Sequence, residues 1–387
     1  MLCTEQRQAV ALALSHRMSI ILGGAGTGKT SIIRAIEECS GQRSIVLCAP
    51  TGKAARNLAQ RTDSRASTVH SLLGVNDSVS FLEAAPLSDT DMVIVDEASM
   101  LTIGMLAGLL KALPQNASFV LLGDPNQLSS VGAGDVIRDL IQIGIPWKQL
   151  TENHRQDPAA LALNYNVYAF DEIHTLEGLR TDESFQFRED DIGTLVRLAS
   201  QMYCKGESIQ VLAATNADVR YLNSLIHAHV NPYTGDERCL RDGDRILVDG
   251  DRVMVLRNDA QHNMCNGDIG TLHIHGDSSI TVDLPDGRCP HWDTSETSAL
   301  LGMITHAYAI TVHKAQGSEY DTVILYAHGV FNRSLLYTAI SRARKRVIIF
   351  GDSQVIERAL HYSAPTRKTS LTERFHNTSL ITKEVSQ

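Results

Sequence analysis

Aromatic residues are scarce in this chain, and signals for membranes or secretion are missing. Only 5% of its 387 residues are Phe, Trp or Tyr, so few rings are available to stack on planar ligands. No apolar run reaches the ~20 residues that a helix needs to cross a bilayer. The start of the chain also lacks the basic segment and long apolar stretch of a secretory signal. We therefore expect a cytoplasmic protein with no membrane contact.

Cysteines are few, odd in number and scattered. The chain has seven of them and no C-x-x-C pair, whereas disulfide frameworks and zinc sites need paired spacings. Reduced thiols in a cytosolic protein fit this pattern best. The net charge of −9 argues against a surface that binds duplex DNA by bulk charge. A local basic or polar groove for nucleic acid stays open.

What the chain does contain is enough apolar material for more than one core. Hydrophobic residues make up 43% of it and charged residues 20%, which is typical of a soluble globular protein. A chain of 387 residues is too long for one ordinary core and suits two to three domains.

The strongest local pattern is the glycine-rich stretch from Gly23 to Thr30. It fits the phosphate-binding pattern G-x-x-x-x-G-K-[ST], between an apolar run at 18–22 and a predicted helix from Lys29 to about Glu38. Its backbone N–H groups can surround phosphate oxygens, and the helix start adds a positive dipole end. Lys29 would reach the β- and γ-phosphates, and the Thr30 hydroxyl would bind Mg²⁺. The alternative, a merely flexible glycine loop, does not explain the context.

Two carboxylates follow a second buried strand. Residues 92–95 are apolar, and Asp96 and Glu97 come directly after them. One carboxylate at such a strand end can hold Mg²⁺, and a second beside it can orient an attacking water. Asp-Glu pairs at strand ends also arise by chance, but after a phosphate loop we favour a hydrolytic site.

Polar groups follow other predicted strands of the first half. A buried strand at 44–49 leads into Pro50 and Thr51, at a corner of the kind where open α/β sheets bind ligands. Thr68 and His70 also supply polar groups, for which an ordinary capped helix is the alternative.

Two further side chains of the first half have suitable chemistry for a phosphate site. Gln127 follows the strand predicted at 118–122 and can sense the γ-phosphate, and Arg155 can present a cation to transferring phosphate. An ordinary surface arginine is the alternative for Arg155.

The second half returns to α/β alternation after a long interval. A strand is predicted from Ile209 to Ala214, and Thr215 and Asn216 begin the helix after it. From about residue 239 to 300 the chain is rich in Gly and Asp, with short β-like runs separated by turn signals. We expect a small β-barrel inserted in a second α/β domain, which resumes with one strand from His306 to Thr311.

Two polar clusters lie in this second domain. Residues 311–319 follow a strand and carry groups suited to phosphate, ribose and strand contacts. Residues 337–344 place arginines on a predicted helix, where Arg342 would act as an arginine finger, a contact worth ~10³–10⁵ in rate. The alternative for Arg342 is a solvated helix face.

Taken in chain order, these stretches resemble the motifs of superfamily 1 helicases, most closely the RecD-like and Dda-like 5′→3′ DNA helicases of the 1B branch. Gln6 resembles the adenine-reading Q motif, Gly23 to Thr30 resembles motif I, and Asp96-Glu97 resembles motif II. Gly123 to Gln127 is similar to motif III.

The remaining motifs continue the resemblance to the end of the chain. Pro50-Thr51 and Thr68 to His70 look like the strand-contacting motifs Ia and Ib. Arg155 and Arg342 fall at the arginines of motifs IV and VI, and Thr311 to Glu319 is similar to motif V. Ser341 stands where Thr is usual in motif VI.

The resemblance implies an α/β fold of two RecA-like P-loop domains in tandem, with a small Src-homology-3-like β-barrel inserted in the second. The implied boundaries are 1–147 for the first domain, with a short hairpin insert at about 74–91, 148–238 and 301–387 for the second, and 239–300 for the barrel. Relatives carry a duplex-splitting pin where this chain has only residues 74–91, so strand separation is a weaker expectation than translocation.

The implied activity is ATP-dependent translocation on single-stranded DNA and DNA unwinding, 5′→3′, with ATP and Mg²⁺ as cofactors. Expected partners are single-stranded DNA, junctions of duplex and single strand, and replication or repair proteins, bound by a monomer. Two other classes stay open: a catalytically weak helicase-like DNA-binding subunit of a recombination or repair nuclease complex, and a non-motor P-loop enzyme such as a kinase. RNA also stays open as the substrate.

The predicted site residues fall into four groups. The catalytic group is Lys29, Glu97, Gln127, Arg155 and Arg342. The ATP-binding group is Gln6, Gly23, Gly24, Ala25, Gly26, Thr27, Gly28, Lys29, Thr30, Gly317 and Glu319. The nucleic-acid-binding group is Pro50, Thr51, Thr68, His70, Thr215, Asn216, Thr311 and His313, and the metal ligands are Thr30 and Asp96.

Overall fold

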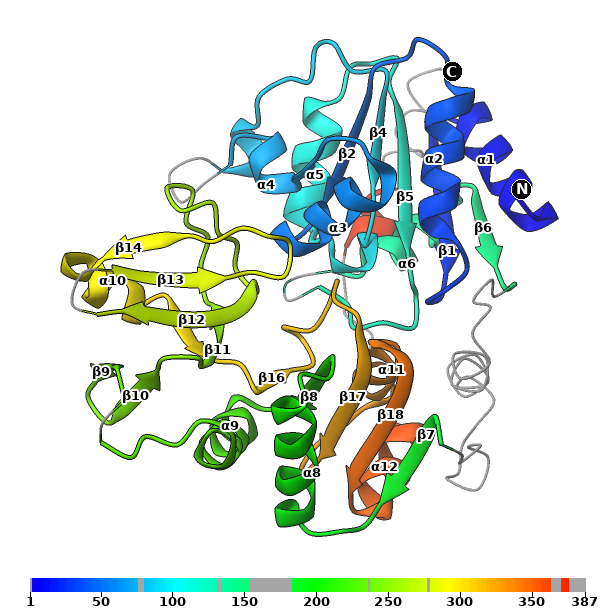
Figure 1. The fold of residues 1–387 in the computed structure, drawn as a ribbon. Helices are drawn as coiled ribbons and strands as arrows, with labels where there is room; N and C mark the ends of the chain where they lie inside the picture. The colour runs from blue at the N-terminus through cyan, green and yellow to red at the C-terminus, as the bar shows by residue number, and fades with distance from the viewer. Residues whose placement is uncertain are drawn as a thin grey trace, which may run out of the picture. The chain divides into compact units, whose positions relative to one another are not determined.

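The chain forms two compact α/β units, which confirms the expected fold class (Figure 1). A computed structural model describes residues 2–75, 80–130, 132, 134–152, 183–235, 237–276, 279–362 and 370–375. The first unit contains the described residues up to 152 together with 370–375, and the second contains those from 183 to 362. Within these ranges, no helix is long and apolar enough to cross a membrane.

The first unit is built on a six-stranded sheet in the order β3-β2-β4-β5-β1-β6. Its strands are β1 (Met18–Gly23), β2 (Ile45–Ala49), β3 (Ala66–Thr68), β4 (Met92–Val95), β5 (Ser118–Gly123) and β6 (Trp147–Leu150). All neighbours run parallel, so the carboxyl ends of the strands lie along one edge. Strand β6 pairs with β1, so this sheet continues past residue 147, where we expected the first domain to end.

Helices cover both faces of this sheet because its strands are apolar on both sides. Ile20 and Leu22 point into a core shared with α4, α5 and α6, whereas Ile21 points into a core shared with α1, α2 and α3. The helices are α1 (Thr4–Ser15), α2 (Lys29–Cys39), α3 (Gly52–Thr62), α4 (Val69–Leu72), α5 (Ile103–Ala112) and α6 (Val136–Gln142), with short 3₁₀-helices η1 (Phe81–Glu83) and η2 (Ala98–Met100).

The segment at 74–91 does not contain the expected hairpin in its described part. Residues 80–91 form η1 and irregular backbone, with no strand among them. Two glycines of α5 make room for it: a Cβ added at Gly108 would lie 3.0 Å from the Phe81 ring, and one at Gly104 would lie 3.3 Å from it. The described part of the segment therefore packs closely on α5.

The second unit has a five-stranded parallel sheet in the order β16-β8-β17-β18-β7. Its elements are β7 (Phe185–Arg188), α8 (Ile192–Cys204), β8 (Ile209–Ala213), α9 (Asn216–Val230), β16 (Ala309–Thr311), β17 (Tyr320–Ala327), α11 (Arg333–Ile340), β18 (Ala343–Gly351) and α12 (Ser353–His361). Helices α8 and α9 share a core with one face of the sheet, and α11 contacts β17 and β18 (Figure 1).

An antiparallel region is inserted between α9 and β16. It contains a sheet in the order β14-β13-β12-β11-β15 and a separate β9–β10 pair, with the fully buried Trp292 in its core. The elements are β9 (Cys239–Asp242), β10 (Arg245–Val248), β11 (Arg252–Val255), β12 (Ile269–His275), β13 (Ser279–Asp283), β14 (His291–Asp293), η5 (Thr294–Glu296), α10 (Thr297–Leu301) and β15 (Ile304–His306). The expected Src-homology-3-like barrel stays a prediction.

The single strand expected from His306 to Thr311 is wrong. The chain instead changes sheets at this point: β15 pairs with β11 in the insert, and β16 pairs with β8 in the parallel sheet. Only Ala307 and Tyr308 separate them, and both are buried. A continuous apolar run hid the change, because hydrophobicity does not record which sheet a strand joins.

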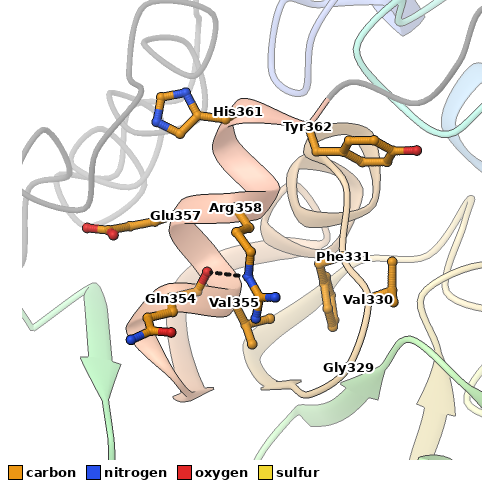
Figure 2. Close-up of a pocket in the computed structure, with 9 residues that line it drawn as sticks. All are labelled: Gly329, Val330, Phe331, Gln354, Val355, Glu357, Arg358, His361 and Tyr362. Atoms are coloured by element: carbon orange, nitrogen blue, oxygen red, sulfur yellow. Dashed lines mark hydrogen bonds between the residues drawn. The ribbon is translucent and has the colours of Figure 1, made fainter.

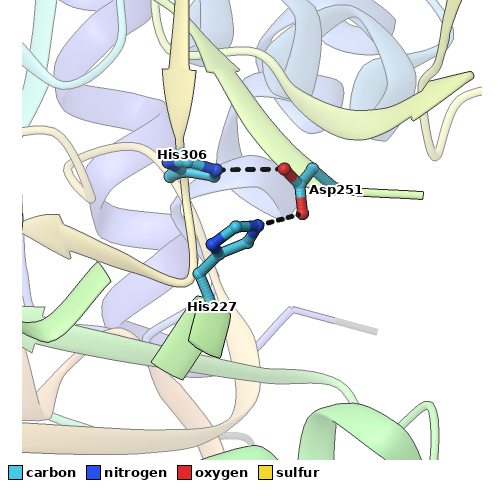
Figure 3. Close-up of side chains that lie close together, drawn as sticks. All are labelled: His227, Asp251 and His306. Atoms are coloured by element: carbon cyan, nitrogen blue, oxygen red, sulfur yellow. Dashed lines mark hydrogen bonds and ion pairs between the residues drawn. The ribbon is translucent and has the colours of Figure 1, made fainter. Parts of the chain in front are cut away.

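One fully buried carboxylate joins the insert to the helical layer of the second unit (Figure 3). Asp251 lies in the turn before β11, His227 comes from α9, and His306 comes from β15. The polar contacts of Asp251 are the Val248 N–H at 2.7 Å, Asn231 Nδ2 at 2.9 Å, Tyr308 Oη at 3.0 Å, His306 Nε2 at 3.0 Å and His227 Nε2 at 3.2 Å.

These donors keep Asp251 ionised. Burial alone would raise the pKa of its carboxyl, but the contacts with His227 and His306, the charge of His306 and the Val248 N–H together outweigh burial and hold the pKa well below the usual range. A carboxylate with a depressed pKa stabilises the folded state above its unfolded pKa of about 3.9, and this contribution disappears as the pH falls.

The substitution Asp251→Asn should lower the free energy of unfolding of the second unit by about 2–3 kcal/mol near pH 7, because it leaves buried donors without a charged acceptor. Urea unfolding can be followed through Trp292 alone in a Trp147→Phe background. Wild-type stability should decline from about pH 5 to pH 3 more steeply than that of the variant. The exposed Asp244→Asn is the matched control; equal effects of the two substitutions would contradict this role for Asp251.

Candidate nucleotide site and strand-facing loops

The glycine-rich loop connects β1 to α2 in the predicted way. Gly26 and Gly28 adopt left-handed backbone conformations, with φ of 83° and 80°, which a side chain would disfavour. The Thr27 hydroxyl donates a hydrogen bond to the Gly24 carbonyl at 2.9 Å and tightens the turn. A Cβ at Gly23 would lie 2.5 Å from Thr27 Oγ1, so this position has no room for a side chain.

Lys29 lies over this loop. Its Nζ donates to the Gly23 carbonyl at 2.5 Å and to the Gly24 carbonyl at 3.1 Å. Because an anionic oxygen is a stronger acceptor than a carbonyl, a phosphate group would compete well for this ammonium. The loop, its lysine and the start of α2 together fit a chain of phosphates.

Gln6 contacts the phosphate loop. Its Nε2 donates to the Thr27 carbonyl at 3.1 Å, and its Oε1 accepts from the Cys3 N–H at 3.1 Å. Cys3 is the N-cap of α1. Gln6 ties this helix to the loop, and its reading of adenine stays a prediction.

Asp96 and Glu97 lie directly beyond β4, within reach of the Lys29 charge. Burial raises the pKa of the Asp96 carboxyl, against the charges of Lys29 and Arg61 and the Glu97 N–H, which donates to Asp96 Oδ1 at 2.9 Å. A partly buried carboxylate whose charged form is disfavoured is stabilised by a cation, so Asp96 fits a divalent metal. Glu97 has φ of 51°, a strained conformation for a residue with a side chain.

Gln127 follows β5, the strand that lies between β4 and β1. Its Nε2 donates to Asp124 Oδ2 at 3.1 Å, and Asp124 Oδ1 accepts from the Asn126 N–H at 3.1 Å. Gln127 Oε1 is buried and lacks a hydrogen-bond partner among the described residues. Strands β4 and β1 flank β5 in the sheet. The loop after β4 carries Asp96, the predicted metal ligand, and the loop after β1 leads to Lys29.

Three predicted strand-contacting threonines serve as helix N-caps. Thr51 accepts from the Ala54 N–H, Thr68 accepts from the Ser71 N–H, and Thr215 accepts from the Asp218 N–H. Pro50 precedes the first cap, the His70 ring lies 5.0 Å from Phe81, and Asn216 is exposed in the first turn of α9. These groups lie at the carboxyl edges of the sheets, and their contact with nucleic acid stays a prediction.

The polar stretch after β16 is partly buried. The Thr311 hydroxyl accepts from the Lys314 N–H at 3.2 Å, whereas His313 is exposed. Gly317 has φ of 73°, a conformation that favours glycine. Glu319, predicted to bind ATP, accepts a hydrogen bond from Arg344 Nε at 3.2 Å.

Arg342 does not lie on a helix, so the predicted helical position is wrong. The alternative, in which Arg342 lies on a solvated helix face, is also wrong. It follows the end of α11 and is only 4% exposed. Its guanidinium donates to the Thr338 carbonyl at 3.2 Å, to the Ser318 carbonyl at 3.4 Å and to Ser341 Oγ at 3.0 Å. These contacts use three of its five N–H donors. Arg155 lies outside the described residues.

Sequence reasoning missed residues that hold these groups in place. Asp124 is 1% exposed and orients Gln127, and Arg61 on α3 lowers the pKa of Asp96. The spacing of Asp124 to Asn126 is typical of an Asx-turn, and this pattern could have identified Asp124 as a positioning residue. No local pattern marks Arg61, because its position depends on how α3 packs.

Two other features of the second unit lie apart from the predicted site residues. A cavity of about 780 Å³ is lined by Gly329, Val330, Phe331, Gln354, Val355, Glu357, Arg358, His361 and Tyr362 (Figure 2). The His227–Asp251–His306 cluster has ligand atoms within 4.8 Å of one another, as a metal site would. Since four hydrogen bonds and the contact with His227 already surround the oxygens of Asp251, we interpret the cluster as a structural joint.

Comparison with known families matches both halves of the chain. Residues 1–186 match the AAA domain family, and residues 306–350 match the UvrD-like helicase C-terminal domain. Solved structures of Pif1 helicase share the fold: the Bacteroides protein with ADP-AlF3 and ssDNA has a TM-score of 0.60 at 20% identity, covering 98% of this chain and 97% of that one. The Candida albicans protein has a TM-score of 0.58 at 18% identity, covering 98% and 99%.

Relatives found by sequence identify the family more narrowly than the shared fold does. The chain is 33% identical over 393 residues to the ATP-dependent RecD2 DNA helicase of Deinococcus radiodurans, covering 96% of this chain but only 52% of that protein, about half its length. It is 30% identical over 430 residues to the RecBCD enzyme subunit RecD of Mycolicibacterium smegmatis, covering 96% of this chain and 74% of the relative. These matches confirm the resemblance: the chain belongs to the RecD-like family of superfamily 1B helicases.

Proposed function

We propose that this chain is an ATP-dependent translocase on single-stranded DNA and a DNA helicase, moving 5′→3′. The observation that carries the proposal is the edge of the first sheet, where the phosphate loop and Lys29 lie near the partly buried Asp96. The RecD2 and RecD relatives and the Pif1 structures support the same class of activity. We propose the 5′→3′ direction because the chain belongs to the 1B branch.

In this proposal the first unit holds ATP and prepares it for hydrolysis. The loop N–H groups and Lys29 bind the phosphates, Gln6 lies where it can meet the adenine, and Glu97 orients the attacking water. Thr30 and Asp96 would hold Mg²⁺, which neutralises charge on the phosphates. Gln127 Oε1, which accepts no hydrogen bond from the described part of the chain, would sense the γ-phosphate and its water.

Arg342 belongs to the proposal through its chemistry as well as its motif. Among the described residues, one N–H on each of its terminal nitrogens donates no hydrogen bond, so the guanidinium retains donors for a phosphate. Arg155 and Gly317 keep their proposed roles in nucleotide binding, whereas the ion pair of Glu319 with Arg344 makes it a positioning group.

We propose single-stranded DNA and its junctions with duplex as substrates, gripped by Pro50, Thr51, Thr68, His70, Thr215, Asn216, Thr311 and His313. Because these groups are mainly hydroxyls, a ring and an amide, they suit backbone contacts more than base reading. A monomer in the cytoplasm that works with replication or repair proteins completes the proposal.

A second candidate function follows from the RecD subunits among the relatives. In that case the chain would be a helicase-like DNA-binding subunit of a recombination or repair nuclease complex, with weak activity of its own. The isolated chain distinguishes the two, because only the first function requires it to hydrolyse ATP and unwind DNA alone.

Single-stranded DNA should stimulate ATP turnover by the isolated chain, and duplexes with a 5′ tail should be unwound in preference to those with a 3′ tail. The physical reason is that strand contacts and hydrolysis belong to one cycle of domain movement. Steady-state ATPase and gel-based unwinding assays measure both. Turnover that ignores DNA would refute the motor, and turnover without unwinding would favour the second function.

The substitution Glu97→Gln should preserve ATP binding and lower turnover by ~10²-fold or more, because an amide cannot act as a general base. Equilibrium binding of a fluorescent ATP analogue and steady-state ATPase assays separate the two effects. Glu38→Gln, on the exposed side of α2, is the control and should change neither. Near-normal turnover in the Glu97 variant would remove this residue from catalysis.

The substitution Arg342→Lys should lower turnover by ~10³-fold or more while ATP still binds, because a lysine keeps the charge but loses the planar fork. Arg344→Lys is the matched control, since Arg344 is exposed two residues away. Circular dichroism should show both variants folded. Equal turnover in the two variants would exclude Arg342 as an arginine finger.

A further inference from the structure

Two stacked aromatic rings lie at the carboxyl end of strand β17, Tyr326 within the strand and His328 just after it. The Tyr326 and His328 ring centroids lie 5.4 Å apart with an interplanar angle of 16°. Tyr326 packs against the core shared with α8 and α9, whereas the side chain of His328 is 63% exposed. The inner ring is therefore anchored, and much of the outer ring is open to solvent.

Hydrogen bonds fix the orientation of the outer ring. His328 Nδ1 lies 3.0 Å from Asp218 Oδ1, and because a carboxylate only accepts, this nitrogen carries the proton. The other oxygen of Asp218 accepts from the Thr215 hydroxyl at 2.6 Å. An exposed histidine ordinarily samples several rotamers, so holding this one beforehand removes an entropic cost of binding a ligand.

The stack lies on the same sheet edge as the proposed strand contacts. Strands β17 and β8 are parallel neighbours, and Tyr326 is in register with Ala213, two residues before Thr215. Tyr221 on α9 is 52% exposed and close enough, with Asp218, to add to burial in raising the pKa of Tyr326. The exposed rings of His328 and Tyr221 thus both lie close to Tyr326.

We propose that the open face of His328 stacks on one base of single-stranded DNA, extending the Tyr326–His328 pair by a third ring. Stacking on an aromatic side chain is tolerant of sequence because every base has a π-face. The inference rests on the proposed function and deepens it, since the other proposed contacts suit the backbone. It assigns to this edge the base contact that a translocase needs in order to hold a nucleotide between steps.

A simpler interpretation is that His328 only neutralises Asp218. That role requires neither the parallel stack on Tyr326 nor an exposed ring face. It also predicts a different result, because loss of the histidine would then alter folding stability but not the recognition of bases.

The test measures binding of a fluorescein-labelled 12-nucleotide oligo(dT), and of an abasic strand of equal length, by fluorescence anisotropy. His328→Ala should weaken oligo(dT) binding by about 5-fold or more, and His328→Phe should restore it to within about twofold of wild type. Neither variant should change binding of the abasic strand or the slope of affinity against salt, because phosphate contacts are untouched. His229→Ala, at the other end of α9 and also exposed, is the control.

Three results would overturn the stacking proposal. Unchanged oligo(dT) binding by His328→Ala would exclude the contact, and an equal loss on both strands would assign the effect to the backbone or to folding. Failure of phenylalanine to restore binding would assign it to the Asp218 hydrogen bond. In each case wild-type binding and DNA-stimulated ATPase would still support the proposed function, whereas loss of both in the wild type would refute the proposed function itself.

Discussion

Parallel pairing of β2, β4, β5 and β1 is the constraint on which the first unit depends. Parallel neighbours bring every strand to its carboxyl end at the same edge, so residues far apart in sequence meet there without a long loop. Lys29 follows one of these strands, Asp96 follows another, and Gln127 follows the strand between them. Both faces of these strands are buried under helices, which fixes where their ends lie within the unit.

Strain and burial are concentrated at this edge. Glu97 has a left-handed backbone conformation and the neighbouring Asp96 carboxyl has a raised pKa, so the loop after β4 is less stable than it need be. Such costs, on the order of 1–3 kcal/mol for the backbone alone, persist only where the surroundings enforce them. A ligand that brings positive charge would stabilise the ionised form of Asp96. This is the physical reason to associate a cation-bound phosphate with this edge.

The sequence was informative where local patterns decide the structure and poor where tertiary packing does. The phosphate loop, β4 and β8 could be predicted closely because each is a short apolar run bounded by polar or glycine residues. The change of sheet after His306 could not be predicted, because β15 and β16, the strands on either side of it, are both largely apolar. Arg342 shows the same limit: its motif was visible, but only packing reveals that its guanidinium is buried against the Ser318 carbonyl.

Contacts within the second unit connect its polar edge to the insert. Arg342 donates to the Ser318 carbonyl, and Lys314, three residues after Thr311, donates to Asn266 Oδ1 of the insert at 2.6 Å. Burial lowers the pKa of Lys314, so this lysine needs its hydrogen-bond partner more than an exposed one would. Asp251, just before β11 of the insert, contacts His227 of α9 and His306 of β15. The hydrogen bond of Lys314 and the contacts of Asp251 therefore join the insert to the loop after β16 and to α9 within the second unit.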